Sequence, residues 1–153
     1  MELMAVVAII AILATMALPG LQSGKVRDQI VAALPLVSIA EGPVAQAWAA
    51  TQTFPTDNSS AGLPAADKIV NNAIRAVAID NGAIHVTFGN SAYPVIAGKV
   101  LTLRPAVVDD APIVPVAWVC GHAAPPDRMT VKGENRTTVP EGFLPFNCRG
   151  TGK

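Results

Sequence analysis

The chain opens with Met1-Glu2-Leu3-Met4-Ala5-Val6-Val7-Ala8-Ile9-Ile10-Ala11-Ile12-Leu13-Ala14-Thr15-Met16-Ala17-Leu18-Pro19-Gly20, and this run decides the fold. Between Leu3 and Leu18 every residue except Thr15 is apolar. A helix rising about 1.5 Å per residue would cover roughly 24 Å over this run, slightly less than the hydrocarbon core of a bilayer, which is about 30 Å thick. The run predicts a helix for lipid or for a buried protein core, and the carboxylate of Glu2 at its start is the exception.

This run does not have the order of a secretory signal peptide. Such a peptide carries basic residues before its apolar stretch and small residues at a cleavage site after it. Here an acid comes first and Leu18-Pro19-Gly20 comes last. The sequence instead resembles the N-terminal segment of type IV pilins, through the residues Glu2-Leu3-Met4, Val6-Val7-Ala8-Ile9-Ile10, Ile12-Leu13-Ala14 and Pro19.

The resemblance implies several properties. In that family a prepilin peptidase removes a leader ending in glycine, and the mature chain begins with an N-methylated phenylalanine a few residues before a glutamate. Glu2 would be that glutamate and would set the register between subunits by pairing with a neighbour's amino terminus. The first residues of the pattern would then be absent before Met1, as expected if the start codon was assigned too late. Pro19 and Gly20 would mark a helix break, where the backbone unwinds in the filament.

The helical pattern continues beyond the apolar run to about Thr53. Charged residues return only at Lys25, Arg27 and Asp28, so the second half is amphipathic, with Glu41 also expected in polar surroundings. A helix of this length would be about 80 Å long, which is typical of a membrane span, a coiled coil or an assembly. Pro35 and Pro43 are expected to bend it, because each lacks the amide of one helical hydrogen bond. Residues 1–53 therefore form the predicted anchor and filament core.

Residues 54–153 are expected to form a globular head. Residues 54–63 are rich in turn formers and separate the two parts, and Ala65 to Asn72 is expected to contain a short helical turn. Asn81-Gly82 lies between two apolar runs, 73–80 and 83–88, and predicts a hairpin with a type I′ turn. Residues 99–104, ended by Pro105, and 116–120 alternate like two more strands. The predicted fold is α+β, a long N-terminal helix packed against a four-stranded antiparallel sheet.

The two cysteines, Cys120 and Cys148, are expected to form a disulfide. A lone pair in a cytosolic enzyme could instead be catalytic or bind metal, but an anchored domain outside the cytoplasm favours the bridge. The flanking residues, 118–121 and 143–149, also resemble the arms of the disulfide-bounded loop that closes many type IV pilins. The bridge would contribute about 3 to 4 kcal/mol through loop-closure entropy.

The sequence offers no constellation that predicts catalysis, a cofactor or a metal site. Its two histidines, His85 and His122, are isolated, and His122 with the cysteines fits no common zinc spacing. The adjacent Asp109 and Asp110 lack an EF-hand context. Eleven basic residues balance eleven acidic ones, so no strongly polyanionic partner is indicated. The bases of the last quarter are mixed with acids, which favours a solvated surface over a DNA-contacting patch.

We therefore expect a non-enzymatic structural subunit of an extracellular type IV pilus. The resemblance implies an inner-membrane location before assembly, a helical homopolymer on the bacterial surface afterwards, and the prepilin peptidase and pilus assembly machinery as partners. Adhesion, twitching motility or DNA uptake would be the filament's roles. The alternatives are a pseudopilin of type II secretion, whose head more often carries a calcium site and lacks the C-terminal disulfide, and an unrelated membrane-anchored binding domain or enzyme.

Overall fold

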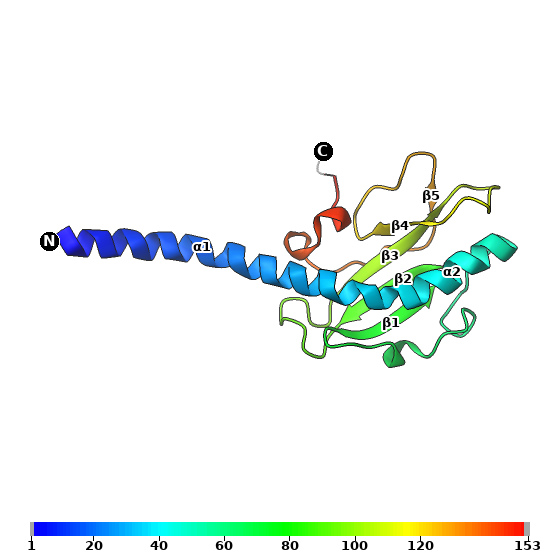
Figure 1. The fold of residues 1–153 in the computed structure, drawn as a ribbon, viewed down its shortest axis with the longest axis horizontal. Helices are drawn as coiled ribbons and strands as arrows, with labels where there is room; N and C mark the ends of the chain where they lie inside the picture. The colour runs from blue at the N-terminus through cyan, green and yellow to red at the C-terminus, as the bar shows by residue number, and fades with distance from the viewer. Residues whose placement is uncertain (1, 152–153) are drawn as a thin grey trace.

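The computed structural model describes residues 2–151 and is organised on one long helical stem, residues 2–51. The stem consists of α1 (Glu2–Ala33), the 3₁₀ turn η1 (Leu34–Val37) and α2 (Ser38–Thr51). Figure 1 shows that its first part projects freely from the head, whereas its last part lies on the sheet. The two parts predicted from the sequence, residues 1–53 and 54–153, include Met1, Gly152 and Lys153, which lie outside the described residues.

The stem is not a single α-helix. Pro35 has no amide to donate to the carbonyl of Val31, and the backbone passes through the 3₁₀ turn η1 at this point. Pro43 lies within α2, which stays α-helical around it. The helix ends two residues before the predicted Thr53, because Gln52 takes a left-handed conformation with φ of 54° and donates its amide to the carbonyl oxygen of Trp48.

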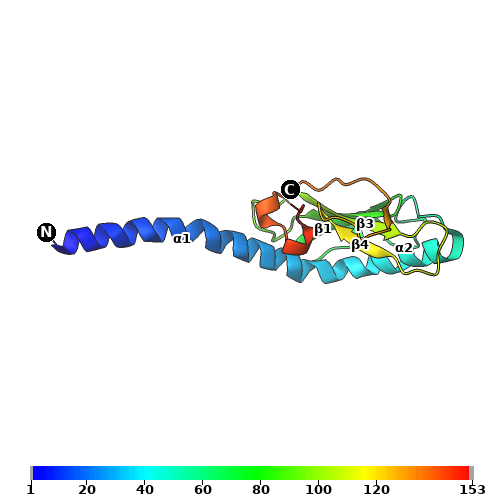
Figure 2. The ribbon, with the colours of Figure 1, turned by 90° about the horizontal axis from the view of Figure 1, so that it is seen from above.

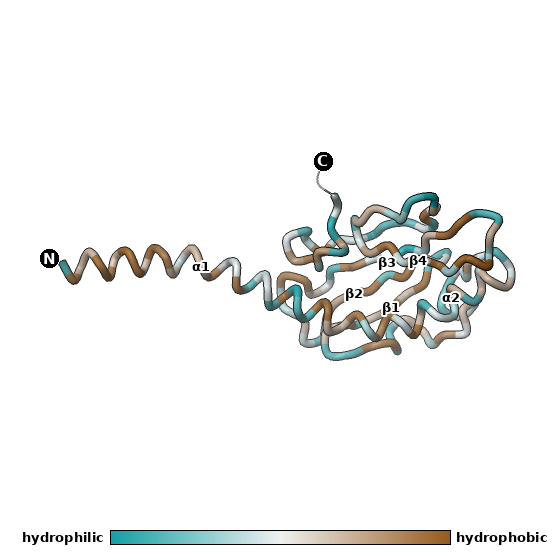
Figure 3. Tube along the Cα trace, turned by 45° about the horizontal axis from the view of Figure 1, so that its top comes forward, coloured by the Kyte–Doolittle hydropathy of each residue, from teal (hydrophilic) through white to brown (hydrophobic). Residues whose placement is uncertain are grey.

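The two halves of the stem have different environments, as predicted. The side chains of Leu3 to Leu18 are exposed where described, and Figure 3 shows this segment as apolar on all sides. Further along, buried residues recur every three or four positions and form one stripe against the sheet: Val26, Ile30, Ala33, Val37, Ala40, Val44 and Trp48. Lys25 and Asp28 are exposed as expected, but Glu41 is half-buried, and this burial raises the pKa of its carboxyl.

The head contains an antiparallel sheet in the order β1-β2-β3-β4, with a short fifth strand beside β3. Strands β1 (Ile74–Asp80) and β2 (Ala83–Phe88) form the predicted hairpin. Both of its central residues have positive φ, 50° at Asn81 and 86° at Gly82, as a type I′ turn requires. The single helical turn expected between residues 65 and 72 is the 3₁₀ turn η2 (Ala66–Lys68).

The third strand is longer than predicted. Strand β3 (Val100–Val107) continues through Pro105, which was expected to end it. Its pairing with β2 stops at Leu103, so the missing amide of Pro105 leaves no bond to β2 unmade, and the proline carbonyl accepts the amide of Lys132. Strand β4 (Ala117–Cys120) then pairs with one side of β3, and β5 (Thr130–Val131), which the sequence did not predict, pairs with its end.

The core lies between the stem and the inner face of the sheet. Side chains such as Val77, Ile84 and Leu101 pack against the buried stripe of the stem, and Leu144 and Cys148 belong to the same cluster. Figure 2 shows the stem along one face of the sheet and the segment after β5 crossing the other. The fold is α+β, a long N-terminal helix packed on an antiparallel sheet.

We call this crossing segment, residues 132–139, the strap. At its start a Cβ on Gly133 would come within 2.7 Å of the Cβ of Ala83, so the backbone lies directly on β2. Near its end the amide of Thr138 donates to the carbonyl oxygen of Val100 at 2.8 Å. The strap thus covers the sheet face that the stem leaves open.

Candidate assembly surface

The free half of α1 presents a long run of exposed apolar side chains. The exposed fraction of its large side chains reaches 78% at Leu3, 79% at Met4 and 74% at Met16. No described part of the head covers this segment. Contiguous exposed apolar surface of this extent marks a contact with protein or membrane, because water solvates it poorly.

Glu2 begins this surface and is exposed. A carboxylate in the first turn interacts favourably with the positive end of the helix dipole, so it does not disturb α1 itself. Among residues 2–151 no cation forms an ion pair with Glu2. Its predicted partner belongs to a neighbouring subunit, and the role of Glu2 in assembly therefore stays a prediction.

The backbone of α1 continues through Pro19 and Gly20 in the single chain. Thr15 lies four residues before the proline, so its carbonyl cannot receive the usual helical bond. A Cβ added to Gly20 would meet nothing within 4 Å, so packing in the single chain does not require a glycine there. The predicted break concerns the assembled filament, and it too stays a prediction.

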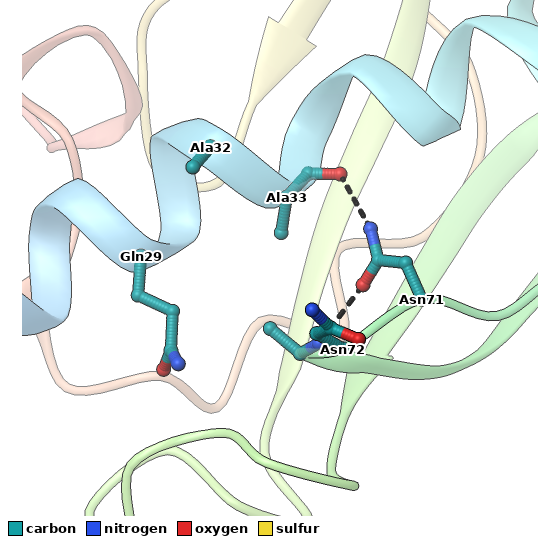
Figure 4. A pocket seen from close by; sticks show the side chains of 6 residues that line it. Gln29, Ala32, Ala33, Asn71 and Asn72 are labelled. Atoms are coloured by element: carbon teal, nitrogen blue, oxygen red, sulfur yellow. Dashed lines mark hydrogen bonds between the residues drawn. The ribbon is translucent and has the colours of Figure 1, made fainter.

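Side-chain amides join the stem to the head. Gln29 donates to the carbonyl oxygen of Ser91 at 3.2 Å and accepts the amide of Tyr93 at 2.9 Å. The Nδ2 of Asn71 donates to the carbonyl oxygen of Ala33 at 3.3 Å (Figure 4). Gln29, Ala33 and Asn71 are among the residues that line a surface recess of about 350 Å³. Because the amides of Gln29 and Asn71 are already bonded to backbone, the recess is a joint between the two parts and does not indicate a ligand site.

A disulfide between Cys120 and Cys148 closes the C-terminal segment. Beside it the amide of His122 donates to the carbonyl oxygen of Cys148 at 2.9 Å. Gly121 has a φ of +55°, and a Cβ there would come within 2.6 Å of the same carbonyl oxygen, so this tight approach requires glycine. The bridge fixes the end of the chain to the end of β4.

We call residues 141–149, which contain the 3₁₀ turns η3 (Glu141–Phe143) and η4 (Phe146–Cys148), the C-terminal hook. Figures 1 and 2 show it beside α1, where the stem enters the head. Arg27 donates from Nε to the carbonyl oxygen of Leu144 at 3.3 Å and from a terminal nitrogen to that of Gly142 at 3.2 Å. Arg149 bonds the same two oxygens, each at 3.0 Å. The hook is therefore attached to both β4 and the stem.

Two side chains considered for catalysis or metal binding, His85 and Asp109, make contacts within the fold. His85 is buried beneath the strap, and its Nδ1 lies 2.9 Å from the Oγ1 of Thr102, which also accepts the amide of Arg136. Burial lowers the pKa of His85, and the Arg136 guanidinium lowers it further. Asp109 accepts Lys132 and Thr130, contacts that lower the pKa of its carboxyl. Within residues 2–151 no group of three His, Cys, Asp or Glu side chains could hold a metal ion.

Sequence reasoning missed several of these contacts. Arg27 was read only as a polar residue, and Gln29 and Asn71 were given no role. Asn58 was assigned to a loop, yet it is buried, donates to the carbonyl oxygens of Pro64 and Val77, and accepts the amide of Ile79. Their partners lie far along the chain, so no local pattern could reveal them.

Comparisons with known proteins agree with this architecture. A family model described as pilin, a bacterial filament protein, matches residues 26–149. The chain is 31% identical to "Type IV major pilin protein PilE" of Neisseria gonorrhoeae over 97% of its length and 90% of the relative. It is 31% identical to "Fimbrial protein EcpC" of Eikenella corrodens over 90% and 89% of the two chains. A "Fimbrial protein" of Neisseria meningitidis serogroup A is 32% identical over 97% and 90%.

Proposed function

Because the chain belongs to the pilin family, we propose that it polymerises through α1 into an extracellular type IV pilus as a structural subunit. The observation that carries the proposal is the contrast between the two halves of the stem. Ile30, Val37 and Val44 are fully or almost fully buried in the head, whereas Ile9, Ile10 and Leu13 are each more than half exposed. A helix that is apolar all round is stable only inside a membrane or a protein core, so this half requires an environment that the single chain does not supply.

Two environments would satisfy α1 in turn. Before assembly the segment is inserted in the inner membrane, where its helical backbone bonds are internally satisfied. After extraction by the assembly machinery, copies of α1 pack against one another in the filament core and present the heads outside. The prepilin peptidase would process the chain before this step. Adhesion, twitching motility and DNA uptake are the filament roles that we propose to test.

We propose that residues 1–53 and 54–153 differ in function but do not fold independently of each other. Residues 1–53 would anchor the subunit and build the filament core, and residues 54–153 would form the outer surface. However, Val26 to Trp48 supply one side of the head's own core. We therefore expect a head without its stem to be unfolded, whereas a chain shortened only by the free half of α1 should remain folded and monomeric.

The proposal is tested on filaments sheared from the bacterial surface. Negative-stain microscopy and mass spectrometry of the main band should identify this chain as the dominant component, with a methylated residue at the mature amino terminus. A strain without the gene provides the control. Filaments of another protein, unchanged in that strain, would contradict the proposal. The pseudopilin alternative, a short periplasmic piston, predicts no surface filaments.

A further inference from the structure

Two guanidinium groups and one exposed ring lie together where the stem enters the head. The Cζ of Arg27 lies 4.5 Å from the centroid of the Phe146 ring, and the Cζ of Arg149 lies 4.6 Å from it. The two arginines also share both of their backbone acceptors, Gly142 and Leu144. The two positive charges are therefore neighbours.

Within residues 2–151 neither guanidinium has a carboxylate within 4.0 Å. The nearby Glu141 accepts the amide of Gly150 at 3.0 Å, and Asp28, which is exposed on α1, forms no ion pair with any residue of the described chain. Each guanidinium carries five N–H donors, and the shared carbonyls occupy only some of them. Two adjacent, half-buried cations with free donors form a site for an anion, and their fork geometry suits the oxygens of a phosphate.

The position of this pair along the stem indicates where such a phosphate comes from. Leu3 to Leu21 at about 1.5 Å per residue spans roughly 28 Å, close to the hydrocarbon thickness of a bilayer. Arg27 lies about 9 Å further along the helix, at the outer edge of the headgroup region, which its long side chain can reach. Lys25 is exposed two positions before Arg27, and the Phe146 ring, which lies against Arg27, is 73% exposed. A basic cluster with an exposed aromatic side chain is typical of segments that lie in the membrane interface.

We propose that Arg27 and Arg149, with the ring of Phe146, bind the phosphate headgroup of an anionic phospholipid and seat the head on the membrane before assembly. This inference rests on the proposed membrane anchor. The guanidinium groups bind the phosphate oxygens, and Phe146 contacts the glycerol and upper acyl region. Leaving the membrane frees both cations, so they are available to a new partner only after extraction.

The test uses the full chain in lipid nanodiscs. Hydrogen exchange of the C-terminal hook is compared between zwitterionic phosphatidylcholine discs and discs that also contain phosphatidylglycerol. The anionic lipid should slow exchange of residues 142–148 by at least about five-fold, the effect of one base near an anionic surface, and high salt should reduce it. A third sample adds inorganic phosphate to zwitterionic discs. Equal protection there would reassign the site to free phosphate.

Variants separate charge from packing. Arg149→Gln should lose the dependence on anionic lipid, and Arg149→Lys, which keeps the charge but not the fork of donors, should retain part of it. Both remove the guanidinium that bonds Gly142 and Leu144, so any loosening of the hook is common to them. Arg128→Gln is the control and should behave like the wild type. Arg128 is exposed in the loop before β5, which pairs with the C-terminal end of β3.

Failure of the site and failure of the anchor give different results. If the amides of residues 3–21 are protected in both discs but the hook exchanges equally in both, the lipid site is wrong and the anchor stands. If those amides exchange freely, the membrane anchor is wrong, and the proposed function fails together with the lipid site. Protection of the hook that arises only in filaments, whatever the lipid, would assign the arginines to an acid of a neighbouring subunit and overturn the proposal.

Discussion

Arg27 in the stem donates its Nε–H to the carbonyl oxygen of Leu144 at 3.3 Å, although the two residues are 117 positions apart in the sequence. This contact and its companion at Gly142 join the first buried turn of the stem to the C-terminal hook. The stem and the C-terminal hook are therefore bonded to each other at the end of the head from which the apolar half of α1 projects. A pulling force on α1 would reach the disulfide-closed segment directly.

Removing this contact should weaken the subunit. Arg27→Ala leaves two carbonyl oxygens with only Arg149 as a donor, and hydrogen bonds to charged groups contribute about 1.5 to 3 kcal/mol each when well shielded. Because Arg27 is half-exposed, we expect the free energy of unfolding to fall by about 1 to 2 kcal/mol. Denaturant unfolding in detergent, followed by tryptophan fluorescence, measures it. Lys25→Ala on the exposed side is the control, and equal losses in both would remove the special role of Arg27.

Glu2 should be required for assembly but not for folding. A carboxylate at membrane depth is unfavourable by several kcal/mol unless it is paired, so a partner on a neighbouring subunit would set the register. Glu2→Ala should leave the head folded and the protein in the membrane while surface filaments disappear. Immunoblots of membrane and sheared fractions measure both. Glu2→Asp keeps the charge and should assemble in part, whereas normal pili from Glu2→Ala would show that Glu2 only lies in the headgroup region.

Loss of the disulfide should act locally. The loop closed by Cys120 and Cys148 spans a sequence separation of 28, and its closure contributes about 3 to 4 kcal/mol in the chain-entropy account. Cys148→Ser should speed hydrogen exchange from Gly121 to Phe146 more than in the hairpin at Asn81-Gly82. Uniform acceleration across both regions would contradict this. Free thiols at both positions in the assembled protein would exclude the bridge itself.

The head should lose stability as the pH falls through the range of His85. Its buried Nε2 has no hydrogen-bond partner in the described chain, and burial and Arg136 lower its pKa below 6.5, while Asp80 and Glu134 oppose this less strongly. The folded state then binds fewer protons than the unfolded state. The contribution is complete above about pH 6.5 and is lost as the pH falls through the folded pKa.

His85→Gln tests this linkage, because glutamine cannot titrate. Denaturant unfolding between pH 7.5 and 4.5 should show a smaller decrease in stability for the variant than for the wild type. Asp57 and Asp109, whose pKa values are lowered in the fold, keep their contribution down to about pH 4, below this range, and both proteins share it. The other histidine provides the matched control in His122→Gln. Identical pH dependence in wild type and His85→Gln would contradict the assignment.

Pro19 should become a break only in the filament. In the bilayer an unpaired carbonyl facing lipid costs several kcal/mol, so residues 11–18 should stay helical there. In the pilus other subunits surround the segment, and Pro19 already withholds one bond and disfavours helix at Leu18. The backbone should unwind just before Pro19 and resume near Leu21, lengthening the subunit by roughly 10 Å. Unbroken helical density from Leu3 through Gln29 would show a simple proline kink instead.

Local patterns predicted much of this fold. The apolar run, the return of charge at Lys25 and the Asn81-Gly82 turn each reflect interactions within a few residues, and these elements lie where they were expected. The predicted end of β3 was wrong. A proline stops a strand only where its missing amide is needed, and β2 no longer pairs with β3 at Pro105. That fact depends on a neighbouring strand and is absent from the local sequence.

Some features of the candidate site could likewise be predicted from the sequence, and others could not. The apolar helix could be identified from composition, and the bridge was expected because an anchored domain outside the cytoplasm favours a disulfide and because the residues around the two cysteines resemble the pilin loop. The convergence of Arg27, Arg149 and Phe146 could not, because it depends on a hook folded back by a disulfide against a distant helix turn. The roles proposed for Glu2 and Pro19 concern contacts between subunits, so a single chain cannot display them.

The most direct test of the central claim is a helical reconstruction from electron micrographs of sheared surface filaments. We expect the side-chain density to fit this sequence, with the α1 segments packed together along the filament axis and the heads and C-terminal hooks outside them. A filament whose density fits a different chain, or one that buries the heads and leaves α1 exposed, would contradict it.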